Sequence, residues 1–230
     1  MKPAISIVIP TLNEADAIAA TLDALIFADA EIIIADGGSG DATLAIAGTY
    51  DVKIRHSKRG RGAQMQTGAN AASGEILWFV HADTTVSANC VGQIKQALRD
   101  KNTVGGNFTI RFDGERLAAR FLTWLYPQLQ FLGLIYGDSA IFVRREVYER
   151  IGGFRDYPIF EDLDFIERLR ESGAIVTLPA VVTTSSRRFA GKSFVLTFAR
   201  WTLLQALYWC GVSPETLLKI YFPTAKSRKR

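Results

Sequence analysis

Three runs of apolar, mostly β-branched residues constrain the fold of this chain most strongly. They read ISIVIP at residues 5–10, EIIIAD at 31–36 and EILWFV at 75–80, and a weaker run lies at 52–56. Continuous apolar runs of this length are typical of strands that are buried on both faces of a sheet. Because a helical segment is expected after each run, the alternation indicates a parallel, doubly wound sheet with right-handed crossovers. We therefore predict an α/β protein whose mostly parallel sheet is flanked by helices.

The second half of the chain has a less regular pattern. The segment FEDLDFIERLRESG at 160–173 is expected to form a helix that begins with acidic residues. No repeat or linker divides the chain, so we predict one α/β domain over residues 1–190. Residues 191–230 are expected to form amphipathic helices and a basic tail that pack on this domain or extend from it. Further strands are expected at 104–112, 139–144 and 174–179.

The segment TLNE at residues 11–14 has the form of a helix-capping box. In such a box, the hydroxyl of Thr11 accepts a hydrogen bond from the first helical turn, and Glu14 reaches back to the start. This interpretation predicts a helix that begins directly after the strand at 5–10.

The basic residues are concentrated at the C-terminus. The formal net charge is +4, and residues 226–230 supply four positive charges, so the rest of the chain is formally neutral (4 − 4 = 0). A nucleic-acid partner is therefore not indicated. The apolar segment 193–212 carries Arg200 in its middle, which favours an amphipathic helix over a membrane span. Peripheral contact of residues 193–230 with an anionic membrane, and packing of the helix on the protein, both stay open.

Two cysteines and the N-terminus indicate the compartment. Cys90 and Cys210 form no metal-binding spacing, and the chain passes from its first residues straight into a strand without a secretory signal region. We therefore expect a cytoplasmic protein, with association to the inner face of the membrane as an alternative.

Polar side chains gather where the predicted strands end. The carboxyl ends of parallel strands meet at one rim of a sheet and ligands bind there, so we expect a ligand site at this rim. The segment GRGAQMQTG at 60–68 matches neither the phosphate-binding GxxxxGK[ST] loop nor the GxGxxG fingerprint. The residues expected at the rim are Thr11, Asn13, Glu14, Asp36, Ser39, Asp41, His81 and Asp83.

Asp83 closes the sequence HAD, which follows the strand at 75–80. A single carboxylate at this place suits Mg²⁺ or Mn²⁺, because such an ion keeps water ligands and takes others from substrate phosphates. The ion would neutralise the charge that develops on a diphosphate leaving group. This chemistry also needs a base for an attacking hydroxyl, and the acidic helix start at 160–164 offers one.

Five motifs occur in a characteristic order. They read IVIPTLNE, IIIADGGSGD, GANAASGEILWFVHADT, IGGF and FEDLDF. Over roughly residues 4–190 the chain resembles the family 2 glycosyltransferases with the GT-A fold, and its length resembles the short single-domain bacterial type. The resemblance implies an inverting transfer of a sugar from a nucleotide-diphosphate sugar to an acceptor hydroxyl, with Mg²⁺ or Mn²⁺. The expected partners are a UDP- or GDP-linked sugar and an unidentified acceptor.

The resemblance also implies roles for individual positions. Asp36 keeps the first acid of the family's Asp-Asp-Gly-Ser segment, which lies by the nucleotide base, and Gly37 replaces the second acid. Asp83 matches the metal-binding acid of the family's Asp-x-Asp motif, and His81 replaces the first acid of that motif.

The family's catalytic base is the aspartate of a Glu-Asp pair, which here is Glu161 and Asp162. Arg187 and Arg188 stand where family members often carry basic residues that meet the diphosphate. The full set expected to contact the nucleotide-sugar is Pro10, Thr11, Asn13, Glu14, Asp36, Gly37, Arg61, Gln64, His81, Ala82, Asp138, Arg187 and Arg188.

Simpler interpretations stay open for several of these residues. The acids at 161–164 also suit the positive end of a helix dipole. His81 is a second metal ligand, a hydrogen-bond partner of Asp83, or a polar strand end. Trp201 and Trp209 are expected to serve core or interface packing.

Two other functions stay open as well. A nucleotidyltransferase has a similar sheet and metal site, but it usually carries a Gly-rich basic loop after its first strand, where this chain has PTLNE. A non-catalytic protein that binds sugar nucleotides would suit the acids missing at Gly37 and His81. The intact Asp83 and Asp162 speak for an enzyme.

Overall fold

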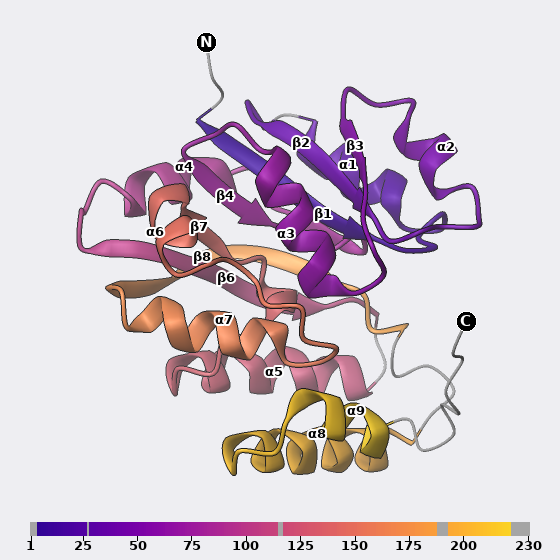
Figure 1. The fold of residues 1–230 in the computed structure, drawn as a ribbon, viewed down its shortest axis with the longest axis vertical. Coiled ribbons are helices and arrows are strands. Elements are labelled where there is room, and N and C mark those ends of the chain that lie inside the picture. Colours follow the sequence, from indigo (N-terminus) through magenta and orange to yellow (C-terminus); the bar gives the residue numbers. More distant parts are fainter. Residues whose placement is uncertain (1–3, 27, 115–116, 188–192, 222–230) are drawn as a thin grey trace.

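The computed structural model describes residues 4–26, 28–114, 117–187 and 193–221. Its centre is a sheet of eight strands in the order β3-β2-β1-β4-β7-β6-β8-β5 (Figure 1). The strands are β1 (Ile5–Thr11), β2 (Glu31–Asp36), β3 (Lys53–His56), β4 (Ile76–Phe79), β5 (Thr84–Val86), β6 (Thr103–Phe112), β7 (Phe142–Arg144) and β8 (Ala174–Thr184). The α-helices are α1 (Ile18–Leu25), α2 (Thr43–Ala47), α3 (Arg61–Ala71), α4 (Cys90–Ala97), α5 (Leu117–Phe131), α6 (Arg145–Arg150), α7 (Glu161–Arg170), α8 (Phe194–Trp209) and α9 (Pro214–Tyr221).

The first four strands along the chain form the parallel half of the sheet. β1 lies between β2 and β4, β3 pairs with the far side of β2, and all three pairings are parallel. β7 then runs antiparallel to both β4 and β6, β6 and β8 are parallel, and β5 pairs antiparallel with the end of β8. The predicted α/β class, with a mostly parallel sheet flanked by helices, is confirmed.

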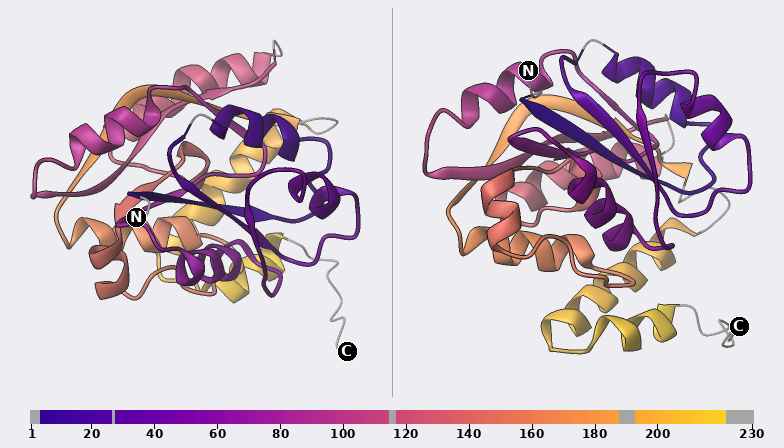
Figure 2. Two further views of the ribbon diagram at one scale, coloured as in Figure 1. Left: turned by 90° about the horizontal axis from the view of Figure 1, so that it is seen from above. Right: turned by 45° about the horizontal axis from the view of Figure 1, so that its top comes forward.

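Alternating side chains of the strands feed two core clusters on opposite faces of the sheet. In β1, the isoleucines at positions 5, 7 and 9 pack with residues of α1, α4 and α5, whereas Val8 packs with residues of α3, α6 and α7. Figure 2 shows these helices on both sides of the sheet. The runs that looked buried on both faces in the sequence are buried on both faces.

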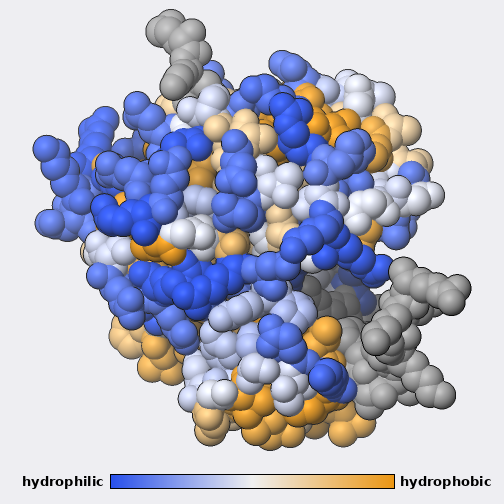
Figure 3. All heavy atoms as spheres, in the orientation of Figure 1, coloured by the Kyte–Doolittle hydropathy of each residue, from blue (hydrophilic) through white to orange (hydrophobic). Residues whose placement is uncertain are grey.

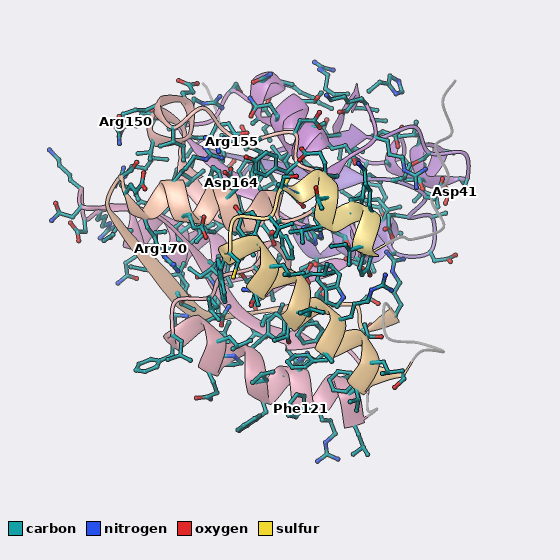
Figure 4. The ribbon with its side chains drawn as sticks, turned by 60° about the horizontal axis from the view of Figure 1, so that its bottom comes forward. Asp41, Phe121, Arg150, Arg155, Asp164 and Arg170 are labelled. Atoms are coloured by element: carbon teal, nitrogen blue, oxygen red, sulfur yellow. The ribbon has the colours of Figure 1, made fainter. Side chains whose placement is uncertain are left out.

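The C-terminal helices α8 and α9 lie beyond α5 and α7 at the lower end of Figure 1. A small apolar cluster joins them to the segment that enters α7, and it consists of Ile159, Phe160, Leu163, Leu204 and Leu217. A second contact is aromatic, because Phe121 of α5 packs against Phe194 and Phe198 of α8 (Figure 4). Among the described residues, no helix is both long and apolar enough to cross a membrane.

The predicted capping box is wrong. β1 continues to Thr11, whose hydroxyl donates to the carbonyl oxygen of Ile9 at 3.1 Å. Helix α1 begins only at Ile18, and its start is formed by the backbone carbonyl of Glu14, which accepts from the amides of Ala17 and Ile18. Neither side chain therefore caps the helix. Thr11 ends β1, and Glu14 lies in the loop after it.

The later strands also differ from their predicted bounds. The strand expected to end at residue 179 continues to Thr184, because Pro179 lies in a register shift between β8 and β6, where a missing amide hydrogen is tolerated. The strand expected at 139–144 is shortened to β7, because Gly137–Ser139 form a 3₁₀ turn. The short strand β5 was not predicted, since three residues carry too little pattern.

A close approach between α3 and β1 generates a test of the fold. A Cβ added at Gly68 would lie 2.3 Å from Cγ1 of Val8, which forces a buried strand or the helix to move. We expect Gly68→Ala to lower the free energy of unfolding by about 1–3 kcal/mol in chemical denaturation.

The matched control is Gly92→Ala in α4, where an added Cβ meets nothing within 4 Å. This substitution should raise the free energy of unfolding by about 0.5–1 kcal/mol, because alanine favours helix. Equal effects of the two substitutions would contradict the described packing of α3 on β1.

Candidate active site

A cavity of about 950 Å³ lies beyond the carboxyl ends of β1 and β4 and extends between α5 and α8. The residues that follow these two strands line one part of it, as expected for a doubly wound sheet. The predicted site residues in its lining are Pro10, Glu14, Arg61, Gln64, His81, Ala82, Asp83, Asp138, Asp162 and Arg187. Those outside its lining are Thr11, Asn13, Asp36, Gly37 and Glu161, and Arg188 lies outside the described residues.

The loops after β1 and β2 are tied together beside the cavity. The carboxylate of Asp36 is 1% exposed and accepts hydrogen bonds from the amide of Gly38 at 2.9 Å and from the amide and hydroxyl of Ser39. Ser39 in turn accepts from the amide of Asn13 at 2.9 Å, and Asn13 Oδ1 accepts from the amide of Gly40 at 2.8 Å. Asp36 and Asn13 therefore hold this corner in one geometry.

The side chain of Gln64 joins the ends of β1 and β2. Its Nε2 donates to the backbone oxygens of Thr11 at 2.7 Å and of Ala35 at 2.9 Å, and the residue is 3% exposed. A Cβ added at Gly37 would lie 3.0 Å from the Gln64 amide carbon. An acidic side chain at position 37, in place of glycine, would therefore have to displace the side chain of Gln64.

Asp83 and Arg187 form an ion pair at one edge of the cavity. Arg187 Nη2 lies 3.2 Å from Asp83 Oδ2 and also forms an ion pair with Glu14. Within the described residues, no group of three or more histidine, cysteine or acidic side chains is arranged to hold a metal ion. A lone carboxylate fits a hard divalent ion that brings its remaining oxygen ligands as water and phosphate, and it does not fit an ion held by the protein alone.

His81 and Asp138 meet across the cavity floor. His81 Nδ1 lies 3.0 Å from Asp138 Oδ1, so Asp138, rather than Asp83, is the partner of the imidazole. Next to them, Asp162 Oδ2 accepts from the amide of Gly137 at 2.7 Å. A Cβ added at Gly137 would lie 3.2 Å from Asp162 Oδ2 and 3.4 Å from His81 Nε2, so the three groups converge around one glycine.

Glu161 lies below the cavity and pairs with a residue one hundred positions earlier. Its carboxylate is 2% exposed, and Arg61 Nε lies 2.6 Å from its Oε1. Burial raises the pKa of Glu161, and the Arg61 guanidinium opposes that increase. The pair anchors the first turn of α7 to the start of α3.

The residue before Glu161 has an unusual backbone conformation. Phe160 precedes α7 with φ 63°, a left-handed conformation that is costly for an aromatic residue. Its ring is buried and packs against Trp201 and Tyr208 of α8, with ring centroids 6.3 and 5.3 Å apart. The packing of α8 therefore stabilises the turn that aims Asp162 into the cavity.

Comparison with known sequences identifies the family. The profile described as "Glycosyl transferase family 2" matches residues 6–152, which is more than half of the chain. The chain belongs to glycosyl transferase family 2. It is therefore a glycosyltransferase, and the predicted resemblance is confirmed.

Individual relatives agree with this assignment. The chain is 30% identical over 207 residues to the PGL/p-HBAD biosynthesis glycosyltransferase of Mycobacterium bovis, which covers 83% of this chain and 79% of the relative. Among solved structures, TarS of S. aureus in complex with UDP-GlcNAc has a TM-score of 0.65 and 17% identity over 85% of this chain, which spans 61% of that chain.

A second similar structure is glucosyl-3-phosphoglycerate synthase from Mycobacterium tuberculosis, solved with Mn²⁺, UDP and glucosyl-3-phosphoglycerate. It has a TM-score of 0.59 and 23% identity, and the match covers 90% of this chain and 80% of the other. At these identities the two structures support the fold alone, which is that of GT-A glycosyltransferases.

The sequence did not reveal that aromatic side chains would form an apolar wall of this cavity. Trp201 packs as expected, against Phe160 and Tyr221, and it also lines the cavity, as do Trp209, Phe198 and Tyr136. The aromatic residues of α8 recur at helical spacing, which is a signal for a packed face. That signal does not tell whether the face meets a core or a cavity.

The Glu161–Arg61 pair generates a prediction on stability. We expect Arg61→Gln to lower the free energy of unfolding by about 3 kcal/mol at neutral pH, since it leaves a buried carboxylate without its cation. The pKa of Glu161 is raised in the folded protein, so its ionisation destabilises the fold as pH rises through that pKa. The loss in Arg61→Gln should therefore shrink in acid, as measured by chemical denaturation across pH.

Arg155→Gln is the control for this measurement. Arg155 is 53% exposed and lies 2.8 Å from Asp164, and the two labelled side chains lie close together in Figure 4. Asp164 keeps Arg168 as a second partner at 2.6 Å, so this loss should stay below about 1 kcal/mol. Equal, pH-independent losses in both variants would contradict a dominant role of the Glu161–Arg61 pair.

Proposed function

We propose that this glycosyltransferase moves a sugar from a UDP- or GDP-linked donor to an acceptor hydroxyl, with inversion and with help from a divalent cation. One observation carries the proposal. A single cavity holds Asp83 with Arg187 at one place, suited to a diphosphate, and Asp162 with His81 at another, suited to a hydroxyl. Structures with UDP-GlcNAc, and with UDP and Mn²⁺, are known for proteins of similar fold, which supports a donor of this class.

Asp162 is the proposed base. Its Oδ2 accepts from Gly137 and its Oδ1 accepts from the amide of Leu163, so two backbone donors fix its orientation. The acceptor oxygen attacks the anomeric carbon on the face opposite the diphosphate, the bond from that carbon to the diphosphate oxygen breaks, and the hydroxyl proton passes to Asp162. His81, held by Asp138, is the neighbouring group that limits how the hydroxyl approaches.

The leaving diphosphate is proposed to meet Arg187 at the Asp83 edge. Arg187 is 46% exposed and is held by Glu14 and Asp83, so its guanidinium is already placed at the cavity. Guanidinium groups bind phosphate oxygens with two parallel hydrogen bonds. Asp83 would hold Mg²⁺ or Mn²⁺ together with the diphosphate, and the cation would neutralise charge on the leaving group.

The two rival functions have less support. The non-catalytic alternative rested on the missing acids, but His81 is placed by Asp138, and Gly37 leaves room that Gln64 occupies. The nucleotidyltransferase alternative needs a basic loop after β1, and the loop found there presents Glu14 to the cavity instead.

Donor binding tests the proposal first. We expect isothermal titration with a panel of UDP- and GDP-sugars to find one donor whose affinity rises in Mn²⁺, and Asp83→Asn to lose that increase. Asp162→Asn should keep donor binding but lower transfer about 10²–10⁴-fold, which is the usual contribution of a general base.

Asp51→Asn, at an exposed residue outside the cavity lining, should change neither quantity. If the folded protein binds no donor of the panel, with or without Mn²⁺, the proposal of a UDP- or GDP-linked donor is refuted. An Asp162→Asn variant with normal transfer would move the base to another residue.

We also propose contact with an anionic membrane through α5 and α8. Apolar residues gather over the lower end of the molecule in Figure 3. The most exposed apolar residues of these helices, together with Leu132 directly after α5, are Leu117, Trp124, Phe131, Leu132, Val195, Leu196, Leu203 and Trp209. Arg111 and Arg120 line a shallow pocket beside Trp124, and the basic residues at 226–230 follow in the sequence. Apolar side chains flanked by arginine suit a bilayer interface with anionic lipids.

Vesicle sedimentation tests this contact. We expect partitioning onto phosphatidylcholine vesicles that contain phosphatidylglycerol, and about tenfold weaker partitioning for Leu196→Ser, since one buried leucine contributes about 1.5 kcal/mol or more. Ile26→Ser, at an equally exposed residue at the end of α1, is the control and should bind as the wild type does. Equal losses in both variants, or no binding at all, would refute the assigned face.

A further inference from the structure

The cavity has two chemically different halves. The half at the strand ends carries the charged residues described above. The other half lies between α5 and α8, and its lining is apolar, with Phe112, Leu122, Leu129, Phe198, Trp201 and Trp209. Only the charged half is needed to explain a nucleotide-sugar, so the apolar half is available to a second molecule.

The two halves join beside the proposed base. Tyr136 precedes Gly137, whose amide holds Asp162, and Phe160 stands two residues before Asp162. Both aromatic residues line the cavity, and Tyr136 also packs against Tyr126 with ring centroids 5.4 Å apart. A molecule that fills the apolar half therefore ends next to Asp162.

One buried polar atom at this junction lacks a hydrogen-bond partner among the described residues. Gln205 of α8 lines the cavity, and its Oε1 accepts from the hydroxyl of Tyr136 at 3.0 Å. Its Nε2 is buried and has no hydrogen-bond partner among the described residues. A buried donor without a partner is costly, so this group is suited to an oxygen of a bound molecule.

We infer that the acceptor is an amphiphile, with an alkyl or aryl body in the apolar half and its hydroxyl at the junction. This inference rests on the proposed transfer function and names its acceptor class. A fully polar acceptor would leave its hydroxyl groups without partners along the apolar wall, which is unfavourable. The acceptor oxygen accepts a hydrogen bond from Gln205 Nε2 and gives its proton to Asp162 when the glycosidic bond forms.

Simple alkanols test the apolar half without any assumption about the head group. Trp201 and Trp209 lie in that half, so tryptophan fluorescence reports its occupancy. We expect 1-octanol to bind at least about tenfold more tightly than 1-butanol, since each buried methylene contributes about 0.8 kcal/mol. Equal affinities for the two alkanols would overturn the inference.

Filling the cavity gives the matched variant. Ala206 of α8 lines the apolar half of the cavity and is not part of the buried core. The phenylalanine of Ala206→Phe should therefore occupy that half and abolish the preference for 1-octanol. Ala20→Phe, at an exposed helical alanine of α1, should keep that preference. Loss of the preference in both variants would overturn the assigned location.

Gln205 provides a test with a distinctive sign. If its Nε2 donates to the bound hydroxyl, Gln205→Leu weakens 1-octanol binding about threefold or more, the effect of one lost hydrogen bond. If the apolar half of the cavity only excludes water, the leucine at position 205 should strengthen the binding of 1-octanol. That result would overturn the role of Gln205. Gln128→Leu, at an exposed residue of α5 outside the cavity lining, is the control and should bind 1-octanol as the wild type does.

Transfer separates this inference from the function on which it rests. With the donor identified by titration, mass spectrometry should find sugar transferred to 1-octanol and little to glycerol. Preference for glycerol, with normal donor binding, would overturn the amphiphilic acceptor alone. Absence of donor binding, with 1-octanol still bound, would instead overturn the proposed transfer while the apolar site stands.

Discussion

The burial of the central strands governs where this molecule can place polar groups. β1 is buried along its whole length and β4 from Leu77 onward, because helices cover both faces of the sheet. A charged side chain within such strands would have no partner, so the charged residues appear only beyond the ends of these strands. Since β1 and β4 are parallel neighbours, their ends deliver Glu14, His81 and Asp83 to one cavity.

Three acids of the site each face a basic side chain. Asp83 faces Arg187, Asp138 faces His81, and Glu161 faces Arg61. These pairings lessen the repulsion among the carboxylates. Glu14 shares Arg187 with Asp83, whereas Asp162 is held by two backbone amides. In the proposed function, Arg187 is the cation held at the edge of the cavity for the donor diphosphate.

The sequence predicted those parts of the structure that depend on local pattern. The buried runs gave the parallel half of the sheet, and the order of motifs indicated the family and the residues at the strand ends. The hydrogen bonds of Gln64 to two strand carbonyls, and the pairing of Arg61 with Glu161, depend on segments far apart in the chain. No local pattern carries that information.

The capping prediction failed for a related reason. TLNE fits a capping box by residue type, but pairing with β2 extends β1 to Thr11 and delays the helix. Tertiary pairing thus overrode a local signal. For Trp201 and Trp209, only the position of α8 decides that an aromatic face also lines a cavity.

The attachment of α8 has a consequence for how such a protein can diversify. The loops after β1 and β2 are cross-linked by Asp36, Asn13 and Gln64, so a substitution there disturbs several strands together. Helix α8 joins the rest mainly through the small cluster around Phe160 and the contact with Phe121. If α8 contacts the acceptor as we propose, changes on its cavity face can accumulate over generations and alter which molecule is glycosylated, while the loops after β1 and β2 stay as they are.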